Sequence, residues 1–242
     1  MIELNKIYNE DCLVGMKRIP DESVDCIICD LPYGTTKNAW DSVIPLNDLW
    51  THYNRIIKEN GAIILFSQMP FAAVLACSNL NDFKYEIVWQ KENATGFLNS
   101  NFAPMKIHEN ILAMIYNPQM IHGCKPYISN RTGISSTNYD YKHSKPITTI
   151  NNGERFPNDI IFFKRDKEKI HPTQKPVDLI RYLVRTYTNV GGCVLDNCMG
   201  SGTTAIACIR EKRNFIGFEL NKEYYDKACK RIQLEMIQPS LF

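Results

Sequence analysis

Hydrophobic residues along the chain follow two alternating patterns. Short apolar runs rich in β-branched residues predict buried strands, and apolar residues three or four positions apart predict helices that cover them. Over the first 116 residues we predict strands at 4–9, 24–29, 62–66, 83–89 and 110–116, and helices at 11–18, 46–57 and 70–77. Leu13 and Met16 are expected to face inward, and Gly61 is the expected stop of the second helix. This alternation is typical of an α/β fold.

Two polar stretches interrupt the alternation. Residues Gln90 to His108 show neither the apolar pattern of a strand nor that of a helix, and they are expected to form a long loop. From Asn117 to about Lys169 the chain is rich in Asn, Ser, Thr, Tyr, Gly and Pro. Order then returns, with helices predicted at 176–187, 203–211 and 222–236 and strands at 193–196 and 214–219. The last helix is expected to bury one face, made of Tyr225, Ala228, Cys229, Ile232 and Met236.

The strand over 24–29 delivers a carboxylate and an aromatic ring to its carboxyl end. Asp30-Leu31-Pro32-Tyr33 follows it directly. Ligands of open α/β sheets bind outside the carboxyl ends of the strands, so chemistry is expected here. An Asp30 that caps a turn, with Tyr33 packed beside it, explains the four residues equally well.

The strand over 193–196 leads into a glycine loop, which is the most specific single motif of the chain. Residues 196–205 read Asp-Asn-Cys-Met-Gly-Ser-Gly-Thr-Thr-Ala and match G-x-G-x-x-A. The glycines let backbone N–H groups approach a ligand, and the next helix presents its N-terminus. Glu219 ends the following strand, where an acid binds ribose hydroxyls. The motif favours an adenosine-type cofactor over a purely structural turn.

The position of this loop indicates an unusual order of strands. A nicotinamide-binding sheet starts with such a unit, whereas here only one helix follows Glu219. The remaining strands must come from the N-terminal half. Residues 5–11 are therefore expected to lie beside the strand that ends at Glu219.

Composition narrows the class of protein. The 242 residues suffice for one α/β domain, alone or with an insert, and 44% hydrophobic and 22% charged residues are typical of a globular protein. No run approaches the roughly 18 apolar residues of a membrane span, and no signal peptide is evident, so a cytoplasmic location is expected. Nine cysteines favour reduced thiols. Cys26 and Cys29 fall on opposite faces of a strand, so we expect both in the core and no metal site.

The polar segment after residue 117 carries the basic charge of the chain. Residues 120–170 hold nine Lys and Arg against five Asp and Glu, although the net charge of the whole chain is only +2. Aromatic residues lie among these charges, a mixture that suits phosphates and unstacked bases. An exposed insert whose charges are simply solvated explains this composition at least as well.

Three motifs together resemble those of a known family. They are Asp30-Leu31-Pro32-Tyr33, Asp196 with Gly200-Ser201-Gly202-Thr203, and His171-Pro172-Thr173-Gln174-Lys175-Pro176. In this order they resemble the permuted, β-class amino-group DNA methyltransferases of the N-4/N-6 methylase family. The first two are similar to those of adenine-specific members from phages and prophages. The resemblance implies a Rossmann-like S-adenosylmethionine-dependent methyltransferase fold, with a circularly permuted mixed sheet and helices on both faces.

The resemblance also implies an organisation and a reaction. Residues 1–116 would form the catalytic half of the domain, 117–170 a target-recognition insert and 171–242 the cofactor-binding half. The implied reaction transfers a methyl group from S-adenosylmethionine to the N6 amine of a flipped adenine in double-stranded DNA. A homodimer and a cognate restriction endonuclease are further implied partners.

The cofactor contacts implied by the resemblance come from several segments. The glycine loop would wrap the methionine part and Glu219 would hold the ribose. Asp11 and Cys12 would meet the adenine, and Thr173 and Lys175 would lie near the methionine carboxylate. A Lys175 that is merely solvated at the helix start is an equal alternative. The full set is Asp11, Cys12, Asp30, Thr173, Lys175, Asp196, Gly200, Ser201, Gly202, Thr203, Thr204 and Glu219.

The implied catalytic residues are Asp30, Leu31, Pro32 and Tyr33. The Asp30 carboxylate and the Leu31 carbonyl would accept hydrogen bonds from the two amine protons, Pro32 would stiffen the loop, and Tyr33 would stack on the base. His171 and His108 are expected to be structural. Methyl transfer needs no base there.

Departures from the family pattern keep alternatives open. Leu31 replaces a more usual proline, and Asn197 and Cys198 replace a proline and a phenylalanine. Asp at position 30 favours adenine N6, with cytosine N4 as the alternative. Methylation of RNA or of a protein glutamine is a second alternative, although the motif order disfavours it. A DNA- or cofactor-binding protein without turnover is a third.

Overall fold

A computed structural model of the protein describes residues 2–34, 42–114, 158–168, 170 and 173–237, together with the backbone of four short strands between 127 and 155. The chain divides into two compact units. The first comprises residues 1–123 and 159–242, and the second Cys124–Asn158.

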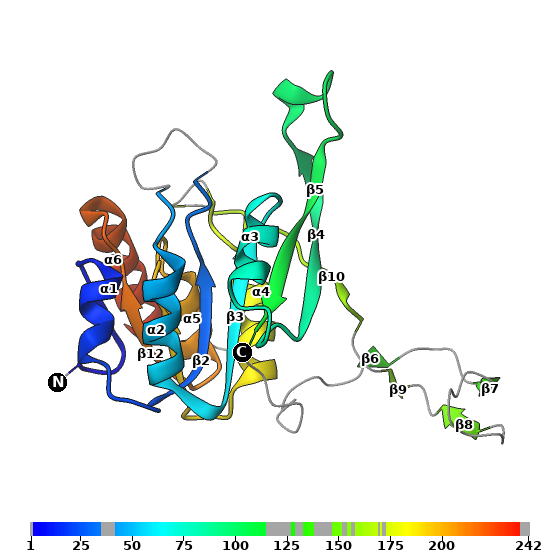
Figure 1. Ribbon diagram of the computed structural model, residues 1–242, viewed down its shortest axis with the longest axis horizontal. Coiled ribbons are helices and arrows are strands. Elements are labelled where there is room, and N and C mark those ends of the chain that lie inside the picture. The colour runs from blue at the N-terminus through cyan, green and yellow to red at the C-terminus, as the bar shows by residue number, and fades with distance from the viewer. Residues whose placement is uncertain are drawn as a thin grey trace. The chain divides into compact units, whose positions relative to one another are not determined.

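The first unit is built on an eight-stranded sheet in the order β1-β12-β11-β2-β3-β5-β4-β10 (Figure 1). Only β5 among these strands runs antiparallel to its neighbours. The strands are β1 (Lys6–Tyr8), β2 (Val24–Asp30), β3 (Ile57–Ser67), β4 (Tyr85–Thr95), β5 (Lys106–Ala113), β10 (Ile160–Phe162), β11 (Cys193–Asp196) and β12 (Asn214–Phe218).

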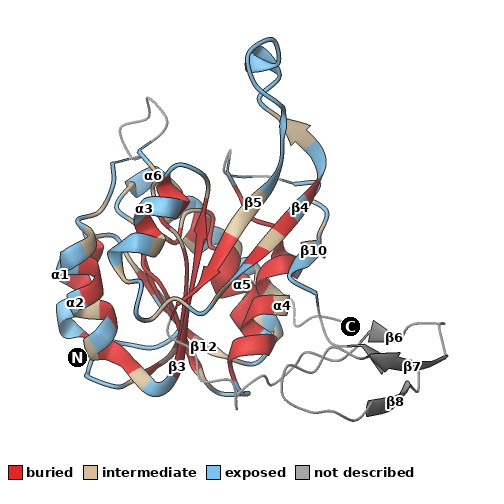
Figure 2. Ribbon diagram, turned by 45° about the vertical axis from the view of Figure 1, so that its right-hand side comes forward, coloured by how far each residue is buried: buried red, intermediate tan, exposed pale blue. Residues whose placement is uncertain are grey.

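Helices cover both faces of this sheet, as expected. On one face pack α1 (Cys12–Gly15), the 3-10 helix η1 (Met16–Arg18), α2 (Leu46–Ile56) and α3 (Phe71–Ser78). On the other pack α4 (Val177–Tyr187), α5 (Thr203–Arg210) and α6 (Lys222–Ile237). Their inward faces are buried (Figure 2). Cys26 and Cys29 are both buried, one in each of the two core clusters, so the prediction that they belong to the core is confirmed.

The strand order confirms the predicted permutation. β1 pairs with β12 in parallel, and the Glu219 amide donates to the Tyr8 carbonyl at 3.0 Å. The N-terminal strand therefore completes the sheet beside the last strand of the chain. As a result, the carboxyl ends of β1, β12, β11 and β2 lie next to one another along one edge.

Two element predictions are wrong. Gly61 does not stop a helix. α2 ends at Ile56, β3 begins at once, and a Cβ on Gly61 would lie 2.6 Å from Ile57 Cγ1. Gln90–His108 is not a plain loop, because β4 continues to Thr95 and β5 begins at Lys106, with pairs at Gln90–His108 and Thr95–Lys106 on either side of a register shift. The apolar period fails there because most of these side chains are exposed.

Smaller differences concern single positions. β10 forms within the stretch that showed no apolar period, and it pairs with β4 in parallel. Met236 is exposed although Ala228 and Ile232 on the same helix are buried, and Leu13 is only half-buried. None of the described helices combines the length and the apolar character that a membrane span requires.

The second unit contains two antiparallel strand pairs. β6 (Tyr127–Ile128) pairs with β9 (Glu154–Arg155), and β7 (Gly133–Thr137) pairs with β8 (Ile147–Asn151). The basic and aromatic side chains predicted to read DNA between residues 120 and 157 lie outside the described residues. The domain boundaries at 117 and 170 stay predictions.

Candidate active site

A cavity of about 650 Å³ opens at the carboxyl edge of the central strands. It is lined by all four predicted catalytic residues and by all but one of the predicted cofactor residues. The exception, Gly202, packs against α6, where a Cβ would lie 3.2 Å from that of Ala228. The predicted residues that line the cavity are Asp11, Cys12, Asp30, Leu31, Pro32, Tyr33, Thr173, Lys175, Asp196, Gly200, Ser201, Thr203, Thr204 and Glu219.

Asp196 fixes the start of the glycine loop. Its Oδ1 accepts from the Cys198 amide at 3.1 Å, and its Oδ2 accepts from the Thr204 hydroxyl at 2.6 Å. Burial raises the pKa of Asp196 to about 7, although both hydrogen bonds oppose that rise. Gly200 and Gly202 adopt positive φ angles of 52° and 76°, which glycine reaches without strain. The loop thus turns sharply from β11 into the N-terminus of α5.

Glu219 closes the loop from the end of β12. Its Oε2 accepts from the Gly200 amide at 2.7 Å and its Oε1 from the Asn221 amide at 2.8 Å. Burial raises the pKa of Glu219, which the two backbone amides oppose. A carboxylate has about four acceptor positions, so Glu219 can bind ribose hydroxyls while keeping both contacts.

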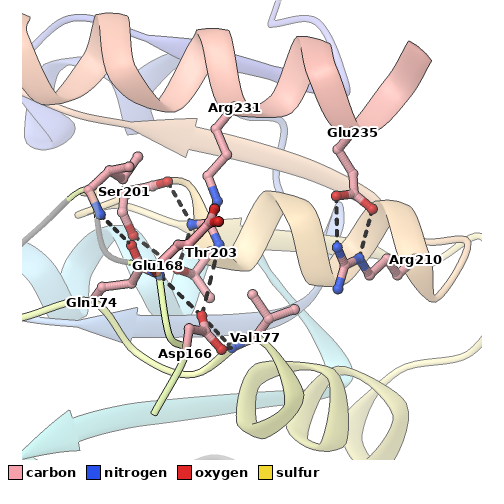
Figure 3. A network of polar contacts seen from close by, with 10 residues as sticks. Asp166, Glu168, Gln174, Val177, Ser201, Thr203, Arg210, Arg231 and Glu235 are labelled. Carbon is pink, nitrogen blue, oxygen red and sulfur yellow. Dashed lines mark hydrogen bonds and ion pairs between the residues drawn. The ribbon is translucent and has the colours of Figure 1, made fainter. Parts of the chain in front are cut away.

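A polar network supports the loop from behind (Figure 3). Arg231 of α6 donates to the Ser201 carbonyl and to the Thr203 hydroxyl, each at 3.1 Å. Asp166 accepts from Gln174 at 3.1 Å and from the Val177 amide at 3.3 Å. The network therefore holds both the loop and the segment that carries Thr173 and Lys175.

Asp30 lies at the end of β2 with both carboxylate oxygens in hydrogen bonds. The Tyr33 hydroxyl donates to Oδ1 at 2.6 Å, and the Lys175 ammonium donates to Oδ2 at 2.5 Å. Burial raises the pKa of Asp30, and the Lys175 charge only partly offsets this. Asp30 is thus a partly buried acceptor group paired with a cation, which is more than a turn cap.

Two further charged groups extend this contact, and sequence reasoning missed both. Lys175 also lies 3.2 Å from Glu109 Oε2, and Lys91 donates to Glu109 Oε1 at 3.0 Å. Lys91 is only 2% exposed. Burial works against the charge of Glu109, yet the two lysines hold its pKa below the usual value. Asp30, Lys175, Glu109 and Lys91 form a chain of ion pairs with no net charge, in which both lysines are buried and both carboxylates are partly buried.

This network decides between the two interpretations of Lys175. The side chain is buried and lies over the Phe66 ring, 5.0 Å from its centroid. The two carboxylates raise its pKa although burial lowers it. Lys175 is therefore a charged component of the site and not a solvated lysine at a helix start.

Aromatic packing fixes Tyr33. Its ring stacks on Phe71 of α3, with centroids 5.5 Å apart and planes inclined by 27°. Since the Tyr33 hydroxyl is also bound to Asp30, both ends of the side chain are held. Phe71 is a second residue that the sequence did not single out.

The departure at position 197 has a structural explanation. Asn197 is buried, accepts from the Tyr53 hydroxyl at 2.5 Å and donates to Cys12 Sγ at 3.6 Å. The amide thereby joins the loop to α2 and to the start of α1. Polar contacts hold the loop where the family more often uses bulky apolar residues.

The remaining predicted residues have varied surroundings. Asp11 caps α1 by accepting from the Leu13 amide at 2.7 Å while it also lines the cavity. His108 is exposed, and His171 lies outside the described residues. Among the described residues, no group of three or more His, Cys, Asp and Glu side chains could hold a metal ion.

Comparison with known proteins identifies the family. The model of the DNA methylase family matches residues 24–230. The chain belongs to the DNA methylase family. The family predicted from the three motifs is thereby confirmed, while the likeness to phage and prophage members stays a prediction.

Named relatives match this DNA methylase over most of its length. It is 30% identical over 251 residues to DNA adenine methyltransferase YhdJ of Escherichia coli (strain K12), across 96% of this chain and 84% of that protein. It is 31% identical over 257 residues to the type II methyltransferase M1.MboII of Moraxella bovis, across 94% and 96%.

Solved structures confirm the fold of the methylase. The M1.HpyAVI–SAM complex has a TM-score of 0.63 at 26% identity, covering 93% of this chain and 98% of that one. The cytosine-N4-specific PvuII DNA methyltransferase has a TM-score of 0.69, covering 98% and 88%, but at 14% identity it shows only a common fold.

Proposed function

We propose that this DNA methylase transfers a methyl group from S-adenosylmethionine to the N6 amine of an adenine flipped out of duplex DNA. One observation carries the proposal. Asp30 and Tyr33, after β2, share a cavity with the glycine loop after β11, and these two strands are neighbours in the sheet. The name of YhdJ supports DNA as the acceptor and adenine as the base, and that of M1.MboII supports methyl transfer.

The acceptor amine needs activation because its lone pair is delocalised into the ring. In the proposed mechanism, the Asp30 carboxylate and the Leu31 carbonyl each accept a hydrogen bond from one of the two amine N–H groups. The nitrogen then moves toward tetrahedral geometry, and its lone pair becomes available. The base stacks on the face of Tyr33 opposite Phe71, and Pro32 restricts the loop.

The cofactor residues orient the donor. When bound, S-adenosylmethionine supplies a methyl group activated by a sulfonium. Glu219 holds the ribose, Asp11 and Cys12 contact the adenine, and the glycine loop surrounds the methionine part. Thr173 and Lys175 line the same cavity. In the proposed mechanism they contact the carboxylate of the methionine part. Holding donor and acceptor in line can supply much of the rate acceleration.

Partners beyond the target base follow from the same proposal. Residues 117–170 serve as the target-recognition segment, because the basic and aromatic residues concentrate there. The type II name of M1.MboII supports a pairing with a restriction endonuclease. We also infer a homodimer, by resemblance to the family.

The test is methylation of mixed-sequence duplex DNA with tritiated cofactor, followed by digestion to nucleosides. We expect label in N6-methyladenine, and a loss of at least about a hundredfold in Asp30→Ala. Asp178→Ala, which removes an exposed carboxylate on α4, is the control and should keep full activity. Label in N4-methylcytosine would assign the other base. Undiminished label in Asp30→Ala would refute the mechanism. If the wild type itself labels no DNA, the protein would instead be one that binds DNA or cofactor without turnover.

A further inference from the structure

The β4–β5 ribbon carries large apolar side chains away from the sheet. Beyond Gln90 the two strands continue as a ribbon that rises above the rest of the first unit (Figure 1). At its tip Phe97, Leu98 and Phe102 are 75%, 93% and 91% exposed. Exposed apolar residues grouped in this way mark an interaction site more often than they occur by chance.

The tip is an ordered turn. The amides of Asn99 and Ser100 donate to the carbonyls of Gly96 and Phe97, each at 3.0 Å, and Phe102 N donates to Asn99 O at 2.9 Å. Gly96 permits the turn with a φ of 91°. The three apolar side chains are therefore presented on a defined backbone.

The ribbon stands over the proposed active site. β4 runs parallel to β2 and β3, so its carboxyl end points to the same edge of the sheet as Asp30. Lys91, Thr95 and Glu109 of the ribbon stem line the same cavity as Asp30. The ribbon therefore borders the cavity into which a base would be delivered.

The outer part of the ribbon carries no negative charge that would repel phosphates. From Asn93 to His108 there is no carboxylate, whereas Lys106 and several amides are present; the two acids of the ribbon, Glu92 and Glu109, lie at its base. β4 has extra residues between the Gln90–His108 and Thr95–Lys106 pairs, so the paired part of the ribbon advances by only two residues of β5, about 7 Å. The turn at residues 96–105 extends beyond it, and the major groove is wide enough to admit a two-stranded ribbon.

We infer that the tip inserts Phe97, Leu98 or Phe102 into the duplex and fills the space that the flipped adenine leaves. The inference rests on the proposed function. Apolar side chains of this kind act as wedges between base pairs in other DNA-binding proteins. Flipping a base leaves its former neighbours unstacked, and an apolar ring restores part of that contact.

The experiment uses Phe97→Ala/Leu98→Ala/Phe102→Ala in the full chain, with Leu80→Ala/Val190→Ala as the control. Leu80 and Val190 are exposed apolar residues that precede β4 and β11, at the opposite edge of the sheet. The target sequence is first mapped on plasmid DNA that the wild type has methylated. Two duplex oligonucleotides containing this sequence then serve as substrates, one fully matched and one with a mismatch opposite the target adenine.

We expect the tip variant to lose about tenfold or more in kcat/KM on the matched duplex, but less than about threefold on the mismatched one, where flipping is easier. The control should match the wild type on both. An equal loss on both duplexes, or no loss, overturns the inference. A wild-type dimer that the tip variant turns into a monomer in sedimentation also overturns it. If the wild type labels no DNA, the proposed function falls as well, which distinguishes the two failures.

Discussion

At the scale of single residues, the site depends on a balance of buried charges. Two ammonium groups and two carboxylates alternate in contact from Asp30 through Lys175 and Glu109 to Lys91. Removing one member leaves a buried charge without its partner, which is strongly unfavourable. Each member therefore influences whether Asp30 is ionised.

Lys175→Met should shift the acidic limb of the pH–activity profile toward higher pH. The Lys175 charge opposes the rise that burial causes in the pKa of Asp30, so without it this pKa rises further. Asp30 must be ionised to accept the hydrogen bond from the amine, and activity is lost as the pH falls through its pKa. We expect a loss on the order of tenfold in kcat/KM at neutral pH, partly recovered at alkaline pH.

Glu109→Gln is the matched variant, because it should shift the same limb the opposite way. The Glu109 charge raises the pKa of Asp30, so its removal lowers that pKa. Without the Glu109 charge, Asp30 is also the only carboxylate that still pairs with Lys175. Both profiles are obtained from kcat/KM at saturating cofactor. If Lys175→Met changes only the KM for the cofactor and leaves the profile in place, Lys175 serves the methionine carboxylate and does not control Asp30.

At the scale of elements, the cofactor loop depends on α6. Arg231→Met removes two hydrogen bonds to the loop, at the Ser201 carbonyl and the Thr203 hydroxyl. Hydrogen bonds from charged groups contribute about 1.5–3 kcal/mol each. Only part of this energy holds the loop in the shape that binds the cofactor, so the loss of binding energy is smaller. We expect the Kd for S-adenosylmethionine to rise about five- to thirtyfold in calorimetry.

Arg210→Met provides the control for that measurement. Arg210 also joins α5 to α6, through Glu235 at 2.7 Å, but it does not touch the loop (Figure 3). Its Kd should stay within about twofold of the wild type. Equal weakening in the two variants would mean that helix packing matters and that the contact with the loop does not.

Elements could be predicted from the sequence where they are buried, and not where they leave the core. β2, β11 and β12 are fully or nearly buried, and their apolar runs mark them. The outer parts of β4 and β5 pair through their backbones while most of their side chains are exposed, so no apolar pattern marks them. The prediction at Gly61 was wrong because a glycine after an amphipathic run commonly ends a helix. Here the residues before Gly61 already belong to β3, which pairs with β2.

At the scale of the whole molecule, the sequence located the motifs but not the contacts between them. Asp30 and Asp196 could be placed together because both end strands of one sheet. The contact of Lys91, Glu109 and Lys175 depends on the pairing of β4 with β5 and on the path of the segment before α4, and neither is encoded locally. Long-range register is therefore what limits prediction of the site.

The division into two units leads to the last prediction. Replacing Cys124–Asn158 by a short Gly/Ser linker removes the second unit and leaves every strand of the eight-stranded sheet in place. Since the cavity is lined entirely by residues of the first unit, the variant should bind S-adenosylmethionine within about twofold of the wild-type Kd, as measured by calorimetry. If the segment reads DNA, methylation of duplex DNA should fall by at least about a hundredfold, because phosphate and base contacts are lost. A variant that keeps the rate and sequence preference of the wild type would show that the insert is only solvated.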